Sequence, residues 1–159
     1  RDMLFGLLIA FAVVGLLMGF LYRSAKMVII ALVPNLIPLL LIGGFMYTYG
    51  IDLKLSTAII FTIAFGIAVD DTIHFLAQYH LERRRGYGKL RSIALSYYGA
   101  GKAIVVTSII LFSGFFTLIG SSFSSTFYLG LLVSLTLLLA VITDLLLLPG
   151  LLYLVDKKD

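Results

Sequence analysis

The sequence is dominated by long apolar runs that are separated by short polar breaks. Hydrophobic residues make up 61% of the 159 residues, whereas soluble domains average roughly 45–50%. A membrane-spanning helix needs about 20 apolar residues, and the chain offers five windows of that length. A strand-based barrel would instead show alternating segments of about 10 residues, which this sequence lacks. We therefore expect an all-α membrane protein with spanning helices at about 3–22, 27–49, 55–79, 103–121 and 126–152.

Basic residues fall almost entirely on one side of the predicted helices. Ten of the twelve Lys and Arg residues lie in the connections 23–26 and 80–102 and in the tail 156–159, and only Arg1 and Lys54 lie on the other side. Basic residues are retained in the cytoplasm, so we expect the amino end outside and the carboxyl end cytoplasmic, in a multi-pass plasma membrane protein such as one of the bacterial inner membrane. No nucleic-acid partner is expected, because the charge of +4 forms no basic face on a soluble fold.

An amino end outside the membrane has to be delivered there. Residues 1–22 lack the charged start and the cleavage site of a signal peptide and lead straight into a spanning helix. We therefore expect this transmembrane domain to be the later part of a larger protein, preceded by an earlier helix and an external soluble domain.

The long cytoplasmic connection carries the pattern of an amphipathic helix at about 88–98. Leu90, Ile93, Ala94 and Tyr97 recur at helical spacing, and basic and hydroxyl side chains occupy the other positions. Such a helix lies on the membrane surface, where membrane lipids with anionic headgroups attract its basic residues.

Two prolines interrupt the second apolar segment. Pro34 and Pro38 each remove a backbone donor and crowd the carbonyl one turn earlier, so a kink or an unwound turn is expected there. Interrupted helices persist in membranes where the freed groups meet protein or cavity water, which makes Asn35 a candidate cavity-lining residue. Simple bending of the helix is the alternative.

Asp70, Asp71 and His74 lie inside the third apolar segment. Each Asp near the middle of a membrane costs roughly 2.5–3.5 kcal/mol on insertion scales, so two in succession indicate an ion or proton site. His74 follows them by four and three residues and can lie beside either carboxylate. Gly66, one turn earlier, offers a thin face that a neighbouring helix can approach. Burial of two adjacent carboxyls predicts at least one exchangeable proton, held by the pair, with a satisfied structural pair as the alternative. One His and two adjacent carboxylates are an incomplete metal shell, so no metal is expected.

Three other polar residues lie in the apolar segments. Thr107 and Ser108 lie in the fourth segment at a depth that matches the Asp pair, which makes them candidate partners of the carboxylates. The alternative is that both hydroxyls bond their own helix carbonyls. Asp144 lies near the cytoplasmic end of the fifth segment, where we expect a structural role and a pairing with a boundary Lys or Arg.

Four motifs together resemble a family of membrane transporters. Residues 66–76 (GIAVDDTIHFL) resemble the fourth-helix motif of the resistance-nodulation-division (RND) superfamily, in the branch of the mycobacterial-membrane-protein-large (MMPL) exporters, Patched and the sterol-sensing proteins. Residues 31–40 (ALVPNLIPLL), 107–115 (TSIILFSGF) and 143–149 (TDLLLLP) resemble the second, fifth and sixth helices, in family order. The five segments would then be helices two to six of one six-helix half, with the C-terminal half preferred.

The resemblance implies a function for the acidic motif. Asp70 and Asp71 match the family residues that relay protons to drive export of lipids or other hydrophobic compounds, and no role carries over for His74. Partners would be that cargo, the other six-helix half and external soluble domains, with a homo-oligomer left open and no cofactor beyond the proton gradient. The alternatives are a sterol-sensing, Patched-like lipid-binding module and the superfamily's protein-secretion motor, whose Asp-Ala-Asn pattern differs from residues 70–72 here. No enzyme is expected, because no nucleophile, metal set or phosphate loop is visible.

Overall fold

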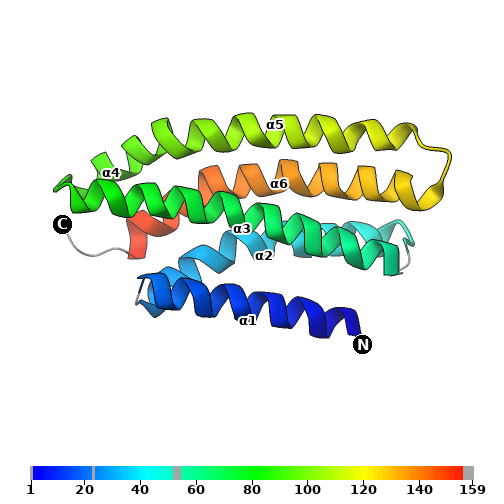
Figure 1. Cartoon of the computed structure of the whole chain (residues 1–159), viewed down its shortest axis with the longest axis horizontal. Helices are drawn as coiled ribbons and strands as arrows, with labels where there is room; N and C mark the ends of the chain where they lie inside the picture. The colour runs from blue at the N-terminus through cyan, green and yellow to red at the C-terminus, as the bar shows by residue number, and fades with distance from the viewer. Residues whose placement is uncertain (1, 23, 52–54, 156–159) are drawn as a thin grey trace.

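The chain folds into long helices that lie side by side along one axis. The computed structural model describes residues 2–22, 24–51 and 55–155, and nearly all of them are helical. Figure 1 shows α5 beside α6, α3 across the front of the bundle, and α2 and α1 below. This arrangement confirms the all-α class. The helices are α1 (Asp2–Tyr22), α2 (Ala25–Thr48), α3 (Leu55–Arg84), α4 (Lys89–Ser96), α5 (Lys102–Phe116) and α6 (Ser124–Val155).

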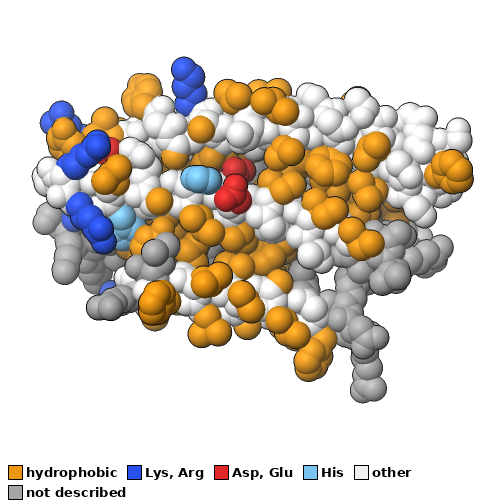
Figure 2. All heavy atoms as spheres, viewed as in Figure 1, with side chains coloured by type: hydrophobic (Ala, Val, Ile, Leu, Met, Phe, Trp, Pro, Cys, Tyr) orange, Lys and Arg blue, Asp and Glu red, His pale blue; other side chains and the backbone are white. Residues whose placement is uncertain are grey.

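Several of these helices can cross a bilayer. Four stretches are long and apolar enough: Ala25–Thr48, Ile59–Arg84, Lys89–Gly120 and Ser124–Val155; a shorter apolar stretch, Leu8–Phe20, lies in α1. Figure 2 shows hydrophobic side chains across the viewed face and basic side chains gathered towards one end. The chain is thus a helical multi-pass membrane protein. The orientation was predicted from twelve basic residues, and five of them lie outside the described residues: Arg1, Arg23, Lys54, Lys157 and Lys158.

Two glycines end the helices that precede tight turns. Gly50 follows α2 with φ of +63°, and Gly86 follows α3 with φ of +89°, a backbone conformation that L side chains rarely adopt. Beyond Gly86, the Tyr87 amide donates back to the carbonyl of Glu82 at 3.3 Å, which closes the end of α3. The chain therefore reverses within four residues, and α4 returns along α3.

The expected amphipathic helix continues into the next span. α4 runs through a π-helical turn, η1 (Tyr97–Gly101), directly into α5. Ser92 and Ser96 on α4 are fully buried, whereas Leu90 is 66% exposed. The serines thus face the bundle, and Leu90 points outward, where a membrane surface would meet it, whereas Ile93 of the same apolar side packs against the core.

The prolines leave α2 intact. The helix continues without interruption from Ala25 to Thr48 with Pro34 and Pro38 inside it, so the unwound turn is absent. Asn35, between the prolines, is only 2% exposed and donates to the carbonyl of Ala31 at 2.7 Å.

The core consists of two apolar layers with a polar layer between them. One layer holds residues such as Ile42, Phe65 and Leu132, and the other holds residues such as Phe75 and Leu148. Along α2, α3 and α6 alike, the residues between these layers include buried polar side chains. They are Asn35, Asp71, Thr72, Thr143 and Asp144.

Candidate functional site

A chain of hydrogen bonds joins three helices inside the polar layer. The Asn35 amide on α2 donates to the hydroxyl of Thr72 on α3 at 2.9 Å. That hydroxyl in turn donates to the Oδ1 atom of Asp144 on α6 at 2.8 Å. All three side chains are at most 2% exposed. The donor direction is therefore fixed from Asn35 through Thr72, and the chain of bonds ends on a carboxyl oxygen.

The Asp144 carboxyl has little support for a negative charge. Its Oδ2 atom has no hydrogen-bond partner and no basic side chain forms an ion pair with it among the described residues. A buried carboxylate is costly unless it is paired and fully hydrogen-bonded. A single neutral hydroxyl is modest compensation, so this site suits a carboxyl that carries a proton or meets water.

Asp71 extends the polar layer towards α5. Its side chain is 7% exposed, and the hydroxyl of Ser108 lies 3.4 Å from its Oδ2 atom, a long hydrogen bond. The same polar layer contains the buried carboxyl of Asp144 on α6. The layer thus holds two buried carboxyls.

Asp70 points in another direction, because neighbouring residues on a helix are turned by about 100°. Its side chain is 70% exposed and lies 3.5 Å from the Nε2 atom of His74, which is 69% exposed. Figure 2 shows acidic side chains beside a histidine in the middle of a largely apolar face. The structure therefore divides the expected carboxylate pair between the polar layer and the surface.

A groove between α3 and α5 is lined by both Asp70 and Asp71. It has a volume of about 780 Å³, and its walls include Asp70, Asp71 and His74 on one side and Thr107 on the other. Gly66 also lines it, with open space where a side chain would begin. Among the described residues no helix approaches Gly66, so the close contact expected at this glycine is absent.

Comparison with known proteins identifies the family. The model of the MMPL family matches residues 1–158, nearly the whole chain. The chain belongs to the MMPL family. A protein of Methanocaldococcus jannaschii that is named only as a membrane protein is 28% identical over 136 residues, which cover 86% of this chain and 35% of that relative. The chain thus spans about a third of the length of this relative. No solved structure matches the chain significantly.

Family membership gives the MMPL chain a coarse role. It is a membrane protein of a family in the RND superfamily, and the earlier resemblance is confirmed. The structure of this MMPL chain shows that its polar residues lie in one layer between two apolar layers.

The two expected hydroxyl partners differ in their contacts. Ser108 reaches Asp71, as the matching depths suggested. Thr107 instead donates to the carbonyls of Ala103 and Ile104 on its own helix, at 3.0 Å each. Its hydroxyl therefore supports α5 rather than a carboxyl, which was the stated alternative.

Sequence reasoning underestimated Asp144 and missed Thr72. The expected boundary pairing of Asp144 with Lys or Arg is wrong, since its partner is Thr72 and it is 1% exposed. α6 continues to Val155, three turns beyond Asp144, so this carboxyl is deeper than its distance from the tail suggested. A partial signal was available: Asn35 and Asp144 are polar residues inside long apolar segments, whereas Thr72 lies beside Asp71 and has no signal of its own.

Proposed function

We propose that this MMPL chain is the proton-coupling membrane part of an RND-type exporter of lipids or other hydrophobic compounds. The observation that carries the proposal is the polar layer, where Asp71 and Asp144 are buried between apolar layers with only hydroxyl groups as hydrogen-bond partners. Ionisable groups inside membranes are expensive, and they mark ion or proton pathways by default. Asp70 and His74 in the groove supply the route by which a proton reaches Asp71.

Protonation can do mechanical work at this position because it changes what the helices prefer to contact. A charged Asp144 needs the Thr72 hydroxyl or water, whereas a protonated one tolerates apolar neighbours. Moving one charge through the membrane supplies about 2.3 kcal/mol per 100 mV. That energy is sufficient to shift packed helices between two arrangements a few kcal/mol apart.

The remaining roles follow from the same proposal. The amino end of the chain lies outside and the carboxyl end in the cytoplasm of a plasma membrane. The chain works with another six-helix half and external domains, uses the proton gradient in place of a cofactor, and carries out no enzymatic reaction.

The experiment uses the full-length protein in lipid vesicles under an imposed pH gradient, with a fluorescent phospholipid as the cargo probe. Asp71→Asn and Asp144→Asn keep the side-chain shape but cannot exchange a proton, so each should reduce transport to background. Asp71→Glu should retain part of the rate. Ser113→Ala is the matched control, since this exposed hydroxyl bonds only the carbonyl of Ile109. Transport at the unmodified rate in both folded Asn variants would contradict the proposal.

The groove favours one alternative, a lipid-binding, sterol-sensing module. Its lining includes apolar side chains such as Ile67, Ile110 and Leu111. Such a module would bind a sterol or lipid without a proton cycle. Binding of a fluorescent sterol that is unchanged by pH and by both Asn variants, together with no proton-driven transport, would favour this function.

A further inference from the structure

Four polar side chains follow one another along a single side of α3. Asp70, His74, Gln78 and Glu82 are spaced four residues apart, and residues at this spacing lie one above the other on a helix. The first three line the groove, while Glu82 lies in the last turn of α3. The line therefore leads from the level of the polar layer to the end of the helix.

Direct contacts link this line in two pairs. The Nε2 atom of His74 lies 3.5 Å from an oxygen of Asp70, and the Gln78 amide donates to the Oε1 atom of Glu82 at 2.8 Å. His74 and Gln78 are one helical turn apart, and a water molecule fits between groups about 5.4 Å apart along the helix. The groove volume of about 780 Å³ leaves room for such water beside both side chains.

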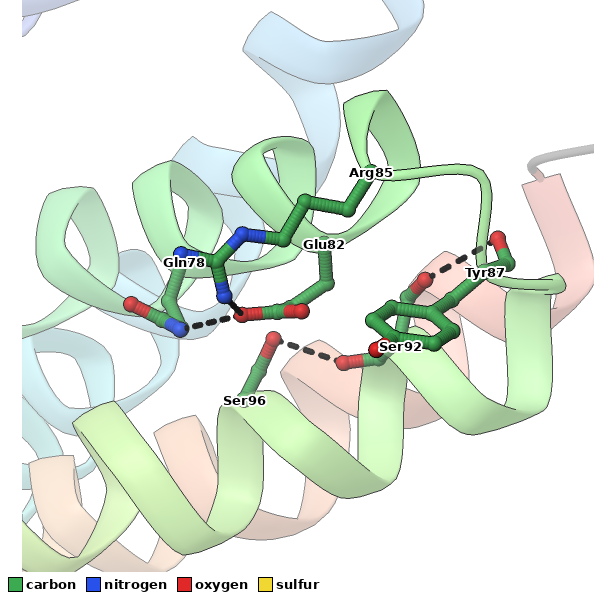
Figure 3. Close-up of polar contacts among 6 residues, drawn as sticks. All are labelled: Gln78, Glu82, Arg85, Tyr87, Ser92 and Ser96. Atoms are coloured by element: carbon green, nitrogen blue, oxygen red, sulfur yellow. Dashed lines mark hydrogen bonds and ion pairs between the residues drawn. The ribbon is translucent and has the colours of Figure 1, made fainter.

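Glu82 is an unusual end for this line because it is a buried acid. The side chain is 3% exposed, although it is two residues from the end of α3. Figure 3 shows Gln78 and Arg85 both reaching the same oxygen of Glu82, with Ser92 and Ser96 of α4 opposite. The second oxygen, Oε2, has no hydrogen-bond partner among the described residues. That oxygen is therefore an unused hydrogen-bond acceptor inside the bundle.

Arg85 forms an ion pair with Glu82. Arg85 donates from Nη1 at 3.0 Å, and its side chain is 58% exposed, so it can move into water. On α4, Lys89 lies over the ring of Tyr153 and Arg91 over the ring of Tyr87. Ser92 and Ser96, which face Glu82 from α4, are neutral. The charged contact of Glu82 is therefore an exposed arginine, and the side chains opposite it on α4 are neutral hydroxyls.

We propose that this line is the cytoplasmic branch of the proton pathway, and that Glu82 is the group that exchanges protons between the cytoplasm and the carboxyls of the polar layer. The inference rests on the proposed function. A protonated Asp70 gives its proton to Nε2 of His74, and the imidazolium releases its other ring proton to water in the groove. The Glu82 carboxylate takes that proton and releases it to the cytoplasm. Each transfer breaks one O–H or N–H bond and forms another, and Gln78 is a positioning residue.

The test follows protons into the full-length protein reconstituted in vesicles. After an acid jump on the side where Glu82 lies, time-resolved infrared spectroscopy records the band of protonated carboxyls, whose buried contribution Asp71→Asn identifies. Glu82→Gln should slow the rise of that band about 100-fold, since a positioned proton carrier is lost. Glu82→Asp should restore most of the rate. Arg85→Gln is the control, because it removes the ion pair and keeps the carboxyl.

The outcomes separate the pathway from a structural tie between α3 and α4. An unchanged rate in folded Glu82→Gln, or equal slowing in Arg85→Gln, would overturn the inference. If Glu82→Gln does not fold, Gln78→Leu carries the test, and an unchanged rate in that variant would likewise overturn it. Loss of the band in Asp71→Asn with a normal rate in Glu82→Gln refutes only this branch. A band and transport unaffected by Asp71→Asn refute the proposed function itself.

Discussion

Thr72 has one hydroxyl that serves two helices at the same time. It accepts from Asn35 and donates to Asp144, and it is fully buried. Among the described residues, this hydroxyl is the point at which α2, α3 and α6 share one hydrogen-bond chain. Replacing Thr72 by valine keeps the shape of the side chain and removes only the hydroxyl, so it measures what these two hydrogen bonds contribute.

Thr72→Val should destabilise the protein and slow transport. Two buried polar groups lose their partner, and each unsatisfied group costs about 1–3 kcal/mol. Thermal unfolding of the purified protein measures the stability, and the phospholipid assay measures the rate. Thr107→Val is the matched control, because that exposed hydroxyl bonds only its own helix. Equal stability of the two variants would show that the hydrogen-bond chain adds nothing.

The site was predictable from sequence where one helix carries the signal. An acid in an apolar run is conspicuous, so Asp70, Asp71 and the adjacent His74 were found. Thr72 carries no such signal, because threonine is common in membrane helices, and its importance comes from Asp144, 72 residues away. Contacts between distant segments depend on which helix faces meet, and the sequence of a single helix does not contain that information.

At the scale of elements, α6 meets the end of α5 at very close range. A Cβ atom on Gly130 would lie 2.8 Å from both the carbonyl oxygen of Phe115 and the Cβ atom of Leu118. Those atoms belong to backbone or to the start of a side chain, so they cannot turn away. Glycine at this position therefore permits the contact, as small residues do between membrane helices.

Gly130→Ala should lower the free energy of unfolding by about 1–3 kcal/mol, the usual cost of overpacking. Gly150→Ala, in the same helix with open space around it, should be neutral or slightly stabilising because alanine favours helix. Thermal unfolding of both variants in detergent measures the difference. A Gly130→Ala variant as stable as Gly150→Ala would mean that α5 moves away at no cost.

Helix positions were more predictable than helix continuity. Apolar length identified each long segment, because a spanning helix must satisfy its own backbone in lipid. The same constraint explains why α2 stays helical through Pro34 and Pro38, against the expected unwound turn. The helix expected at about 88–98 and the span expected at about 103–121 are instead joined by a π-helical turn, which apolar length and spacing do not reveal.

At the scale of the whole molecule, the connections between helices fall at two ends. The turn after α2 and the turn before α6 should lie outside, and the turn between α3 and α4 should lie in the cytoplasm. Cysteines introduced at the exposed residues Tyr49 and Phe123 should react with an impermeant maleimide added outside cells. A cysteine at exposed Gly88 should react only after the membrane is opened. The chain has no cysteine of its own, so its background is zero. Labelling of all three from one side would refute the proposed orientation.

The attachment of α5 to α6 has a mechanical consequence. The two helices are fastened at one end through Gly130 and at the other through the Tyr97 hydroxyl, which donates to the carbonyl of Leu145. Because contacts hold them at both ends, we expect the two helices to move as one unit. Thr72, however, belongs to α3 across the groove, so any turn that widens the groove also pulls Asp144 against its hydrogen bond to Thr72. We therefore expect the width of the groove and the strength of the hydrogen bond between Thr72 and Asp144 to change together.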